Sequence, residues 1–369
     1  MLKRLMAWAG IALWFFQGVA ADKTVGDTSD FVTRKVEVSQ GLMGLTTATL
    51  VDIVYTPMDG KTEVEVYAPE NLQADILVDV DENGMLVVRR RQNRDKGWER
   101  LEKIPKVRVK APAVHTLCTS SSGDIILTDA LQVEGLVGMR TNSSGDIKGK
   151  NIACDELSLS TNSSGDIRFG TIVCKQKAKF SSNSAGDITM DVVRCPVVSV
   201  YANSSGDIDG NDVTCGELTM QTNSSGDIGL VSVECERTVS VRSASSGDVK
   251  VARITATEVS AALFSCGNIT LPSVSCTGVK VSVTSSGDMQ IGGTCNRAFF
   301  SVDGSGEMNA VRLKADEVDV RLGRGEVQCH AVKKLSATST YRGTVCYKGN
   351  PEIVSHGSSG MTIKKIATN

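Results

Sequence analysis

A five-residue tract, Ser-Ser-Gly-Asp-Ile, recurs along most of this 369-residue sequence and constrains its fold more than any other feature. With its near and weaker copies, the tract places a glycine at positions 123, 145, 165, 186, 206, 226, 247, 267, 287, 306, 325, 343 and 360. The spacing is about 20 residues and tightens to 17 at the end. A repeat this short cannot bury its own apolar side, so neighbouring repeats must stack against one another.

Apolar residues hold fixed places between successive tracts. After Asp207, the places one, six, eleven and thirteen residues on are taken by Ile208, Val213, Leu218 and Met220, and other repeats keep similar residues there. Within each short segment these residues alternate with polar ones, which is the period of a β-strand. Each repeat is therefore predicted to supply about three short strands and then a Ser/Gly turn, where glycine provides a positive φ.

The predicted fold is all-β, a single-chain β-solenoid of the β-helix kind with coils of about 20 residues. Each coil would pair with the next at a distance of about 4.8 Å, so thirteen coils would form a rod of roughly 60 Å. A sandwich or a propeller is the alternative, but the repeat is too short for a four-stranded blade. The pattern leaves the handedness and the number of sides open.

Residues 1–21 are predicted to be a secretory signal peptide. Lys3 and Arg4 precede an apolar run over residues 5–16, and Val-Ala-Ala at 19–21 offers small residues for cleavage. A membrane anchor is the alternative, but the run is shorter than the roughly 20 residues that span a bilayer. The mature chain is expected to lack a transmembrane segment and to be exported to the periplasm, the outer membrane surface or the extracellular space.

The rest of the chain divides into a linker at 22–29, a non-repeating β region at 30–115 and the repeat solenoid at 116–369. The β region contains short β-branched or alternating stretches separated by turn pairs such as Asp59-Gly60 and Asn83-Gly84. It is either a small β domain or an irregular start of the solenoid. In the second case it would cap the open end, because an uncovered terminal coil is an adhesive edge.

The charge balance bears on the class of partner. The sequence has 40 Lys+Arg and 42 Asp+Glu, a formal net charge of −2. Removal of the signal peptide with Lys3 and Arg4 leaves 38 against 42, or −4. A nucleic-acid binder normally carries a basic face, so no nucleic-acid partner is predicted.

Several segments resemble a known family, the head GIN domain family of auto-transporter adhesins, which is frequent in Bacteroidetes-type bacteria. The similar segments near the start lie at 36–41, 64–66, 70–72 and 84–88, and those near the end at 347–351 and 358–360. The Gly-Asp-Ile turns are also similar, and the resemblance covers about residues 30–366. It implies a solenoid-like all-β fold and a location in the cell envelope or on the surface. It brings no catalytic residue and no cofactor, and the high cysteine content departs from it.

The aspartates of the tract are predicted to stack along one edge. The members are Asp124, Asp146, Asp166, Asp187, Asp207, Asp227, Asp248 and Asp288. At 4.8 Å and an effective dielectric of 20, neighbouring carboxylates repel by roughly 3.5 kcal/mol. Hydrogen bonds from turn N–H groups and Ser hydroxyls would offset this repulsion, and this structural role is favoured. A row of Ca²⁺ ions bound along the first seven aspartates is the alternative. Because the structural role is favoured, no metal site and no cofactor are predicted.

An asparagine precedes five of the aspartates by four residues. The five are Asn142, Asn162, Asn183, Asn203 and Asn223. Stacked Asn side chains hydrogen-bond to one another, so the row is predicted to stabilise a solenoid corner. Each Asn also begins an Asn-x-Ser sequon, but five glycans about 4.8 Å apart would not fit on one edge.

A cysteine follows five successive aspartates by eight residues, which predicts an inward row. The five are Cys154, Cys174, Cys195, Cys215 and Cys235, out of 11 cysteines in the chain. Disulfides are expected in exported proteins. However, parallel side chains on adjacent coils hold their Cβ atoms wider apart than a disulfide prefers. A buried row of thiols is favoured, and disulfides stay the alternative.

The chemistry-bearing residues predict a binding protein and not an enzyme. The three histidines, at 115, 330 and 356, are scattered, and no nucleophile with a base can be assigned. A surface protein that binds a glycan or matrix partner along an extended solenoid surface is favoured. A self-associating envelope scaffold is the alternative, and a polysaccharide-active β-helix enzyme is less favoured.

Overall fold

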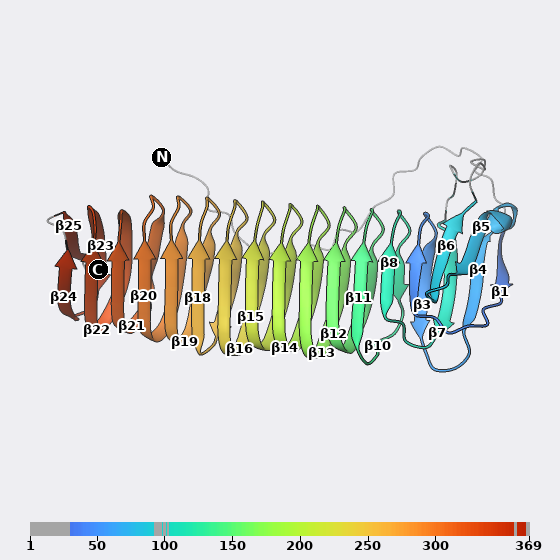
Figure 1. Ribbon diagram of the computed structural model, residues 1–369, viewed down its shortest axis with the longest axis horizontal. Helices are drawn as coiled ribbons and strands as arrows, with labels where there is room; N and C mark the ends of the chain where they lie inside the picture. The colour runs from blue at the N-terminus through green and yellow to red at the C-terminus, as the bar shows by residue number, and fades with distance from the viewer. Residues whose placement is uncertain (1–29, 92–97, 99–100, 102, 358–359, 367–369) are drawn as a thin grey trace, which may run out of the picture.

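The computed structural model describes residues 30–91, 98, 101, 103–357 and 360–366. The predicted signal peptide at 1–21 and linker at 22–29 lie outside these residues. The structure is 68% strand and 2% helix, and it forms a β-solenoid of about 12 turns with coils of about 20 residues. Figure 1 shows the coils side by side along a straight rod, with the first strands at one end and the last at the other. The predicted fold class is confirmed.

The regular coils are single long strands. They are β12 (Ile147–Thr161), β13 (Ile167–Ser182), β14 (Ile188–Ala202), β15 (Ile208–Thr222), β16 (Ile228–Ser243), β19 (Ile269–Val283), β20 (Met289–Val302), β21 (Glu307–Leu322) and β22 (Gly325–Ser339). Between β16 and β19, one coil is divided into β17 (Val249–Thr255) and β18 (Glu258–Leu263). The prediction of three separate short strands per coil is wrong, because parallel pairing with the next coil resumes directly after each corner, as at Asp212 and again at Glu217 of β15.

Three flanks are still recognisable within each long strand. In β15 the alternation of buried and exposed residues is interrupted at Asn211–Asp212, which are both exposed, and again at Cys215–Gly216, which are both buried. The first flank therefore ends near Gly210, and the third begins at Leu218. Neighbouring coils keep this phase because they pair in parallel and in register, as Val213 of β15 does with Val193 of β14.

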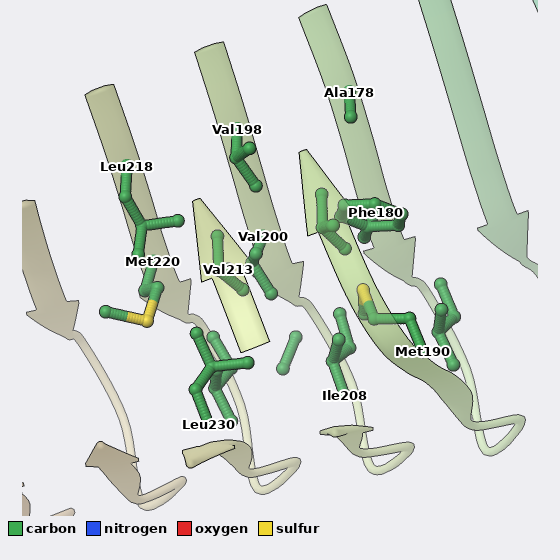
Figure 2. Packing of buried hydrophobic residues seen from close by; sticks show 14 of the residues in the cluster. Ala178, Phe180, Met190, Val198, Val200, Ile208, Val213, Leu218, Met220 and Leu230 are labelled. Atoms are coloured by element: carbon green, nitrogen blue, oxygen red, sulfur yellow. The ribbon is translucent and has the colours of Figure 1, made fainter. Parts of the chain in front are cut away.

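The core fills the inside of the coils with stacked rows of like residues. Figure 2 shows Met190 and Leu230 on either side of Ile208, while Leu218 and Met220 follow Val198 and Val200 one coil further along. These side chains are all less than 4% exposed. Full burial of one such side chain stabilises the fold by roughly 1.5–3 kcal/mol, so the core rows hold the coils together.

The N-terminal region shares a sheet with the repeats and covers one end of the rod. Its strands are β1 (Phe31–Val36), β2 (Gly44–Thr47), β3 (Asp52–Pro57), β4 (Glu63–Pro69), β5 (Ile76–Val80), β6 (Met85–Arg90) and β7 (Lys106–Ala111), with a 3₁₀ helix, η1 (Glu70–Asp75). β2 and β3 pair in parallel with β8 (Thr116–Thr119) and β9 (Ile125–Leu127). β4 pairs antiparallel with β1 and β7. The predicted boundary between residues 115 and 116 stays a prediction.

The remaining elements complete the first and last coils. Strands β10 (Leu131–Gln132) and β11 (Leu136–Thr141) both pair with β12 and make up an interrupted early coil. At the other end, β23 (Gly343–Lys348), β24 (Glu352–Gly357) and β25 (Met361–Lys365) follow β22. β24 pairs with β22, and β25 pairs with β23.

The tract glycines have a different cause from the one predicted. The described glycines with positive φ are Gly60, Gly84, Gly135, Gly293, Gly325 and Gly349, and only Gly325 belongs to the tract series. At Gly145, an added Cβ would overlap the carbonyl oxygen of Gly123 in the previous coil, and Gly165 stands in the same relation to Gly145. The prediction of a positive φ is therefore wrong for most of the tract. Glycine is needed there because successive turns approach backbone to backbone.

Candidate ligand-binding surface

The aspartates of the tract form a continuous hydrogen-bonded row. In each case the side-chain oxygen Oδ1, a carboxylate oxygen in the aspartates and an amide oxygen in Asn268, accepts the backbone N–H of the residue at the same place in the next coil. The distances run from 2.7 to 3.1 Å. The accepting residues are Asp52, Asp124, Asp146, Asp166, Asp187, Asp207, Asp227, Asp248, Asn268 and Asp288. These bonds stabilise the turns and offset part of the repulsion between carboxylates.

Sequence reasoning missed the first member of this row. Asp52 lies in the N-terminal region, outside the repeats, and its Oδ1 accepts the N–H of Asp124 at 3.0 Å. The signal that could have found it is the pair Asp52-Ile53, which matches the last two residues of the tract. Burial raises the pKa of Asp52, and the negative charge of Asp124 adds to the rise.

Basic side chains neutralise part of the aspartate row. The Lys148 ammonium lies 3.3 Å from Asp124 and 2.8 Å from Asp146, and Arg168 lies 2.9 Å from Asp166. Further along, burial raises the pKa of Asp227, and so do the charges of its neighbours in the row. Among the described residues, no three His, Cys, Asp or Glu side chains are grouped to hold a metal ion.

The asparagines also contact one another from coil to coil. From Asn162 onward, each donates from its side-chain amide to the carbonyl oxygen of the Asn in the previous coil, whereas Asn142 donates to the Cys118 sulfur. The distance is 2.9 Å from Asn162 to Asn142 and from Asn183 to Asn162. It is 2.8 Å from Asn203 to Asn183 and 2.7 Å from Asn223 to Asn203. The row lies on the turn edge of the rod and contains no group that performs chemistry.

The five cysteines lie on the second flank and point inward. Cys154 faces Cys174, and Cys215 faces both Cys195 and Cys235 in the strand register. All five are buried free thiols. The shortest described approach is between the sulfur atoms of Cys154 and Cys174, at 3.7 Å.

A groove of about 860 Å³ crosses β18, β19, β20, β21 and β22, and sequence reasoning missed it. One side is a row at the corner between the second and third flanks, made of Glu258, Gly278, Arg297, Glu317 and Lys334, which pair coil to coil. The other side is an outward row of the third flank, made of Lys280, Phe299, Asp319 and Ser336. A signal was present in the sequence, since Asp316-Glu317 and Lys333-Lys334 lie about one repeat apart.

The shape of the groove follows from a missing side chain and from ion pairs. Gly278 carries no side chain, and a Cβ there would overlap the Glu258 carboxylate, so Glu258 lies across this position. Arg297 pairs with Glu317 at 3.5 Å, and Lys333 pairs with Asp316 at 2.9 Å. These pairs link neighbouring coils along the corner and hold the charged groups in place.

Two further features leave groups available to a ligand. Phe299 is half-buried, and the Arg321 guanidinium lies 4.9 Å from its ring centre. This cation–π contact fixes the ring at the surface. Within the described residues, neither Lys280 nor Lys334 forms an ion pair, although both are exposed. The groove thus combines one oriented aromatic ring with unpaired hydrogen-bond donors.

Solved structures with similarity to the chain come from Bacteroides and Parabacteroides species. A putative adhesin from Bacteroides fragilis is 19% identical, with 92% of this chain and 98% of that chain covered and a TM-score of 0.27. A putative lipid binding protein from Parabacteroides distasonis is 19% identical, with 93% and 98% covered and a TM-score of 0.27. A putative adhesin from Parabacteroides merdae is 12% identical, with 92% and 98% covered and a TM-score of 0.27. TM-scores of this size do not support any finer comparison.

Among curated proteins, no match to the chain was found. Across the described residues, no helix has the length and apolar character required to cross a membrane. A family model described as "Putative auto-transporter adhesin, head GIN domain" matches residues 44–228, 170–270 and 230–351. These matches span most of the chain and confirm the resemblance noted in the sequence. The chain belongs to the head GIN domain family.

Proposed function

We propose that this protein is an exported, non-enzymatic surface adhesin that holds a linear glycan in the groove across β18–β22. The family description supports the adhesin class. The signal-peptide pattern at 1–21 supports export. The observation that carries the proposal is the groove itself, because one of its two rows of hydrogen-bonding side chains contains an oriented aromatic ring.

The length of the groove fits an extended polymer. Five neighbouring coils spaced by about 4.8 Å give a track of about 19 Å along the rod. The two rows run in the same direction, since Lys280, Phe299 and Asp319 face one another in successive coils. A glycan with roughly one sugar ring per coil would present each ring to one step of the track. An aromatic face packs against the apolar face of a sugar ring, while charged groups bind its hydroxyls.

The charge of the groove indicates a neutral glycan. Its lining has four acidic residues, Glu258, Asp316, Glu317 and Asp319, and four basic ones, Lys280, Arg297, Lys333 and Lys334. Equal numbers of both signs give no net field to attract a highly charged polymer. They do supply many donors and acceptors, which suits the hydroxyl groups of an uncharged sugar.

The test is binding of the mature chain to a panel of neutral and acidic polysaccharides, followed by calorimetry on those that bind. Phe299→Ala is expected to weaken binding by about 1–2 kcal/mol, or roughly 5–30-fold in Kd, because the ring is the single aromatic group in the groove lining. Tyr201→Ala is the matched control, since Tyr201 is half-buried on the same flank but outside the groove. Equal loss in both variants, or none in Phe299→Ala, would contradict the assignment.

Self-association as a scaffold is favoured by one observation, which is that the outer edge of the last described coil has backbone groups available for pairing. β24 and β25 pair with β22 and β23 on one side, and no described strand pairs on the other. Against stacking, β25 carries Lys364 and Lys365, and lysine on an edge strand opposes edge-to-edge pairing. Light scattering over a range of concentrations separates the two functions, because a scaffold grows with concentration and the proposed adhesin stays a discrete species.

A further inference from the structure

The first two cysteines of the inward row lie in adjacent coils at the distance of a potential bond. Cys154 of β12 and Cys174 of β13 are register partners, and their sulfur atoms are 3.7 Å apart. Neighbouring strands place paired Cα atoms about 4.8 Å apart. A disulfide accepts Cα separations of about 4.4–6.8 Å, so rotation of the two side chains can bring the sulfurs into bonding distance.

A local irregularity gives this pair room to adjust. The strand register shifts directly after it, because Cys154 pairs with Cys174 while Glu156 pairs with Lys177. β13 therefore contains one more residue than β12 at this corner, which is a β-bulge. A bulge bends its strand and loosens the ladder, so the Cβ atoms beside it can move closer than they do in a regular parallel pair.

Cys154 is also the thiol at the open end of the row. The preceding coil is interrupted between β10, which ends at Gln132, and β11, which begins at Leu136. A hollow of about 330 Å³ lies there, and Cys154, Val133, Val173 and Lys175 are among its lining residues. Cys174 is not in that lining. A small molecule that enters the hollow therefore meets Cys154 before Cys174.

We propose that Cys154 and Cys174 form a thiol–disulfide exchange site, which accepts a low-molecular-weight disulfide through this hollow and becomes a disulfide between two coils. Cys154 is the attacking thiol, and Cys174 is the resolving thiol. The other three cysteines of the row, Cys195, Cys215 and Cys235, lie outside the lining of the hollow and are not part of the site.

The hydrogen bonds around the pair assign these roles. Cys154 donates its own proton to the carbonyl oxygen of Glu156 at 3.2 Å, which leaves Cys154 as the acceptor and Cys174 as the donor in the contact between the two sulfur atoms. The bond from Cys174 lowers the pKa of Cys154, which favours its thiolate. The same bond and a second one to Cys195 raise the pKa of Cys174, so that thiol keeps its proton until Cys154 has reacted.

The exchange balances in two steps. The Cys154 thiolate attacks one sulfur of the small disulfide, a bond forms between protein and small molecule, and one small thiolate leaves. That thiolate takes the proton of Cys174. The Cys174 thiolate then attacks the Cys154 sulfur, the inter-coil disulfide forms, and the second small thiolate leaves and takes a proton from water. Two protein thiols are oxidised, and one small disulfide is reduced to two thiols.

The test is peptide mapping of the native full chain after incubation with oxidised glutathione. Trypsin cuts after Lys150, Arg168 and Lys175, so the two thiols fall on separate peptides, 151–168 and 169–175. The two peptides are expected to be joined by a disulfide that formed while the chain was still folded, before any denaturant was added for digestion. In Cys174→Ser, Cys154 is expected to stay attached to glutathione as a trapped mixed disulfide. In Cys154→Ser, Cys174 is expected to stay a free thiol.

Cys235→Ser is the matched control, because Cys235 belongs to the same buried row but not to the lining of the hollow. It is expected to form the 151–168 and 169–175 link at the rate of the unaltered chain. The proposal is overturned if the unaltered native chain gives no linked peptides, or if the link appears only after unfolding. It is also overturned if the trapped glutathione in Cys174→Ser lies on a cysteine other than Cys154.

Discussion

Substitution of a tract glycine by alanine tests the packing of the turns most sharply. At Gly165, an added Cβ would overlap the carbonyl oxygen of Gly145 and would lie 2.8 Å from that of Ser143. Both neighbours are backbone atoms of the adjacent coil, so no flexible side chain can move aside. The coils would have to separate at the turn, which strains the hydrogen bonds of the aspartate row on either side.

The expected cost follows from two opposing effects. Overpacking against rigid neighbours costs about 3 kcal/mol. Replacement of glycine by alanine also reduces the entropy of the unfolded chain, which returns up to about 1 kcal/mol. Gly165→Ala is therefore expected to lower the free energy of unfolding by about 2–3 kcal/mol. Gly138→Ala is the matched control, since no atom lies within 4 Å of its added Cβ and its φ is not positive, so it is expected to be neutral or slightly stabilising.

Urea unfolding followed by circular dichroism measures both variants. Repeat arrays can open locally, so hydrogen exchange of the amides at 143–147 and 163–167 accompanies it and reports the turns directly. Gly165→Ala should speed exchange at these turns, while Gly138→Ala should leave it unchanged. Equal stability of the two variants would refute the reasoning, because it would mean that the coils do not approach each other closely at the tract.

Two further predictions follow from the polar rows. Asn183→Ala removes its amide donation to Asn162 and Ser160 and its carbonyl acceptance from Asn203, and is expected to cost about 1–2 kcal/mol in urea unfolding. Asn211→Ala is the control, since Asn211 is equally exposed and, among the described residues, donates only to Asp191, so a smaller loss is expected; equal effects would contradict a stabilising row. Asp227 has a raised pKa, so the folded state binds its proton more tightly than the unfolded state does. The stability that this proton contributes is present below the unfolded pKa and is lost as pH rises through the folded pKa. Asp227→Asn keeps an Oδ1 acceptor, which Asn268 provides naturally in its own turn. The variant should therefore be more stable than the unaltered chain at pH 7 but not at pH 3. Thermal melts at both pH values check this, and a variant destabilised at pH 7 would contradict it.

The repeat determined most of what could be predicted about the fold. Fixed apolar places such as those of Ile208, Val213 and Leu218 mark the inward rows, because each row needs the same residue type in every coil. The continuity of each strand could not be predicted, since a strand that turns a corner loses its alternation there. The role of the tract glycines was also hidden, because close approach and positive φ select the same residue.

The groove depends on contacts that a single repeat does not contain. Arg297 and Glu317 are 20 positions apart, and they become neighbours only because β20 and β21 keep register through a shift earlier in the strand. The missing side chain at Gly278 matters because Glu258 of the previous coil reaches across it. The same holds for the hollow beside Cys154, which results from the interrupted coil between β10 and β11. Such features arise where the chain departs from the repeat, whereas the repeat pattern predicts only what every coil has in common.

The proposed adhesin would act at the cell surface, so protease added to intact producing cells should reach it. The protein would be probed before and after lysis, alongside a periplasmic protein as the control for envelope integrity. Digestion of this protein in intact cells, with the periplasmic control spared, is the expected result. Protection of both proteins until lysis would contradict a surface adhesin.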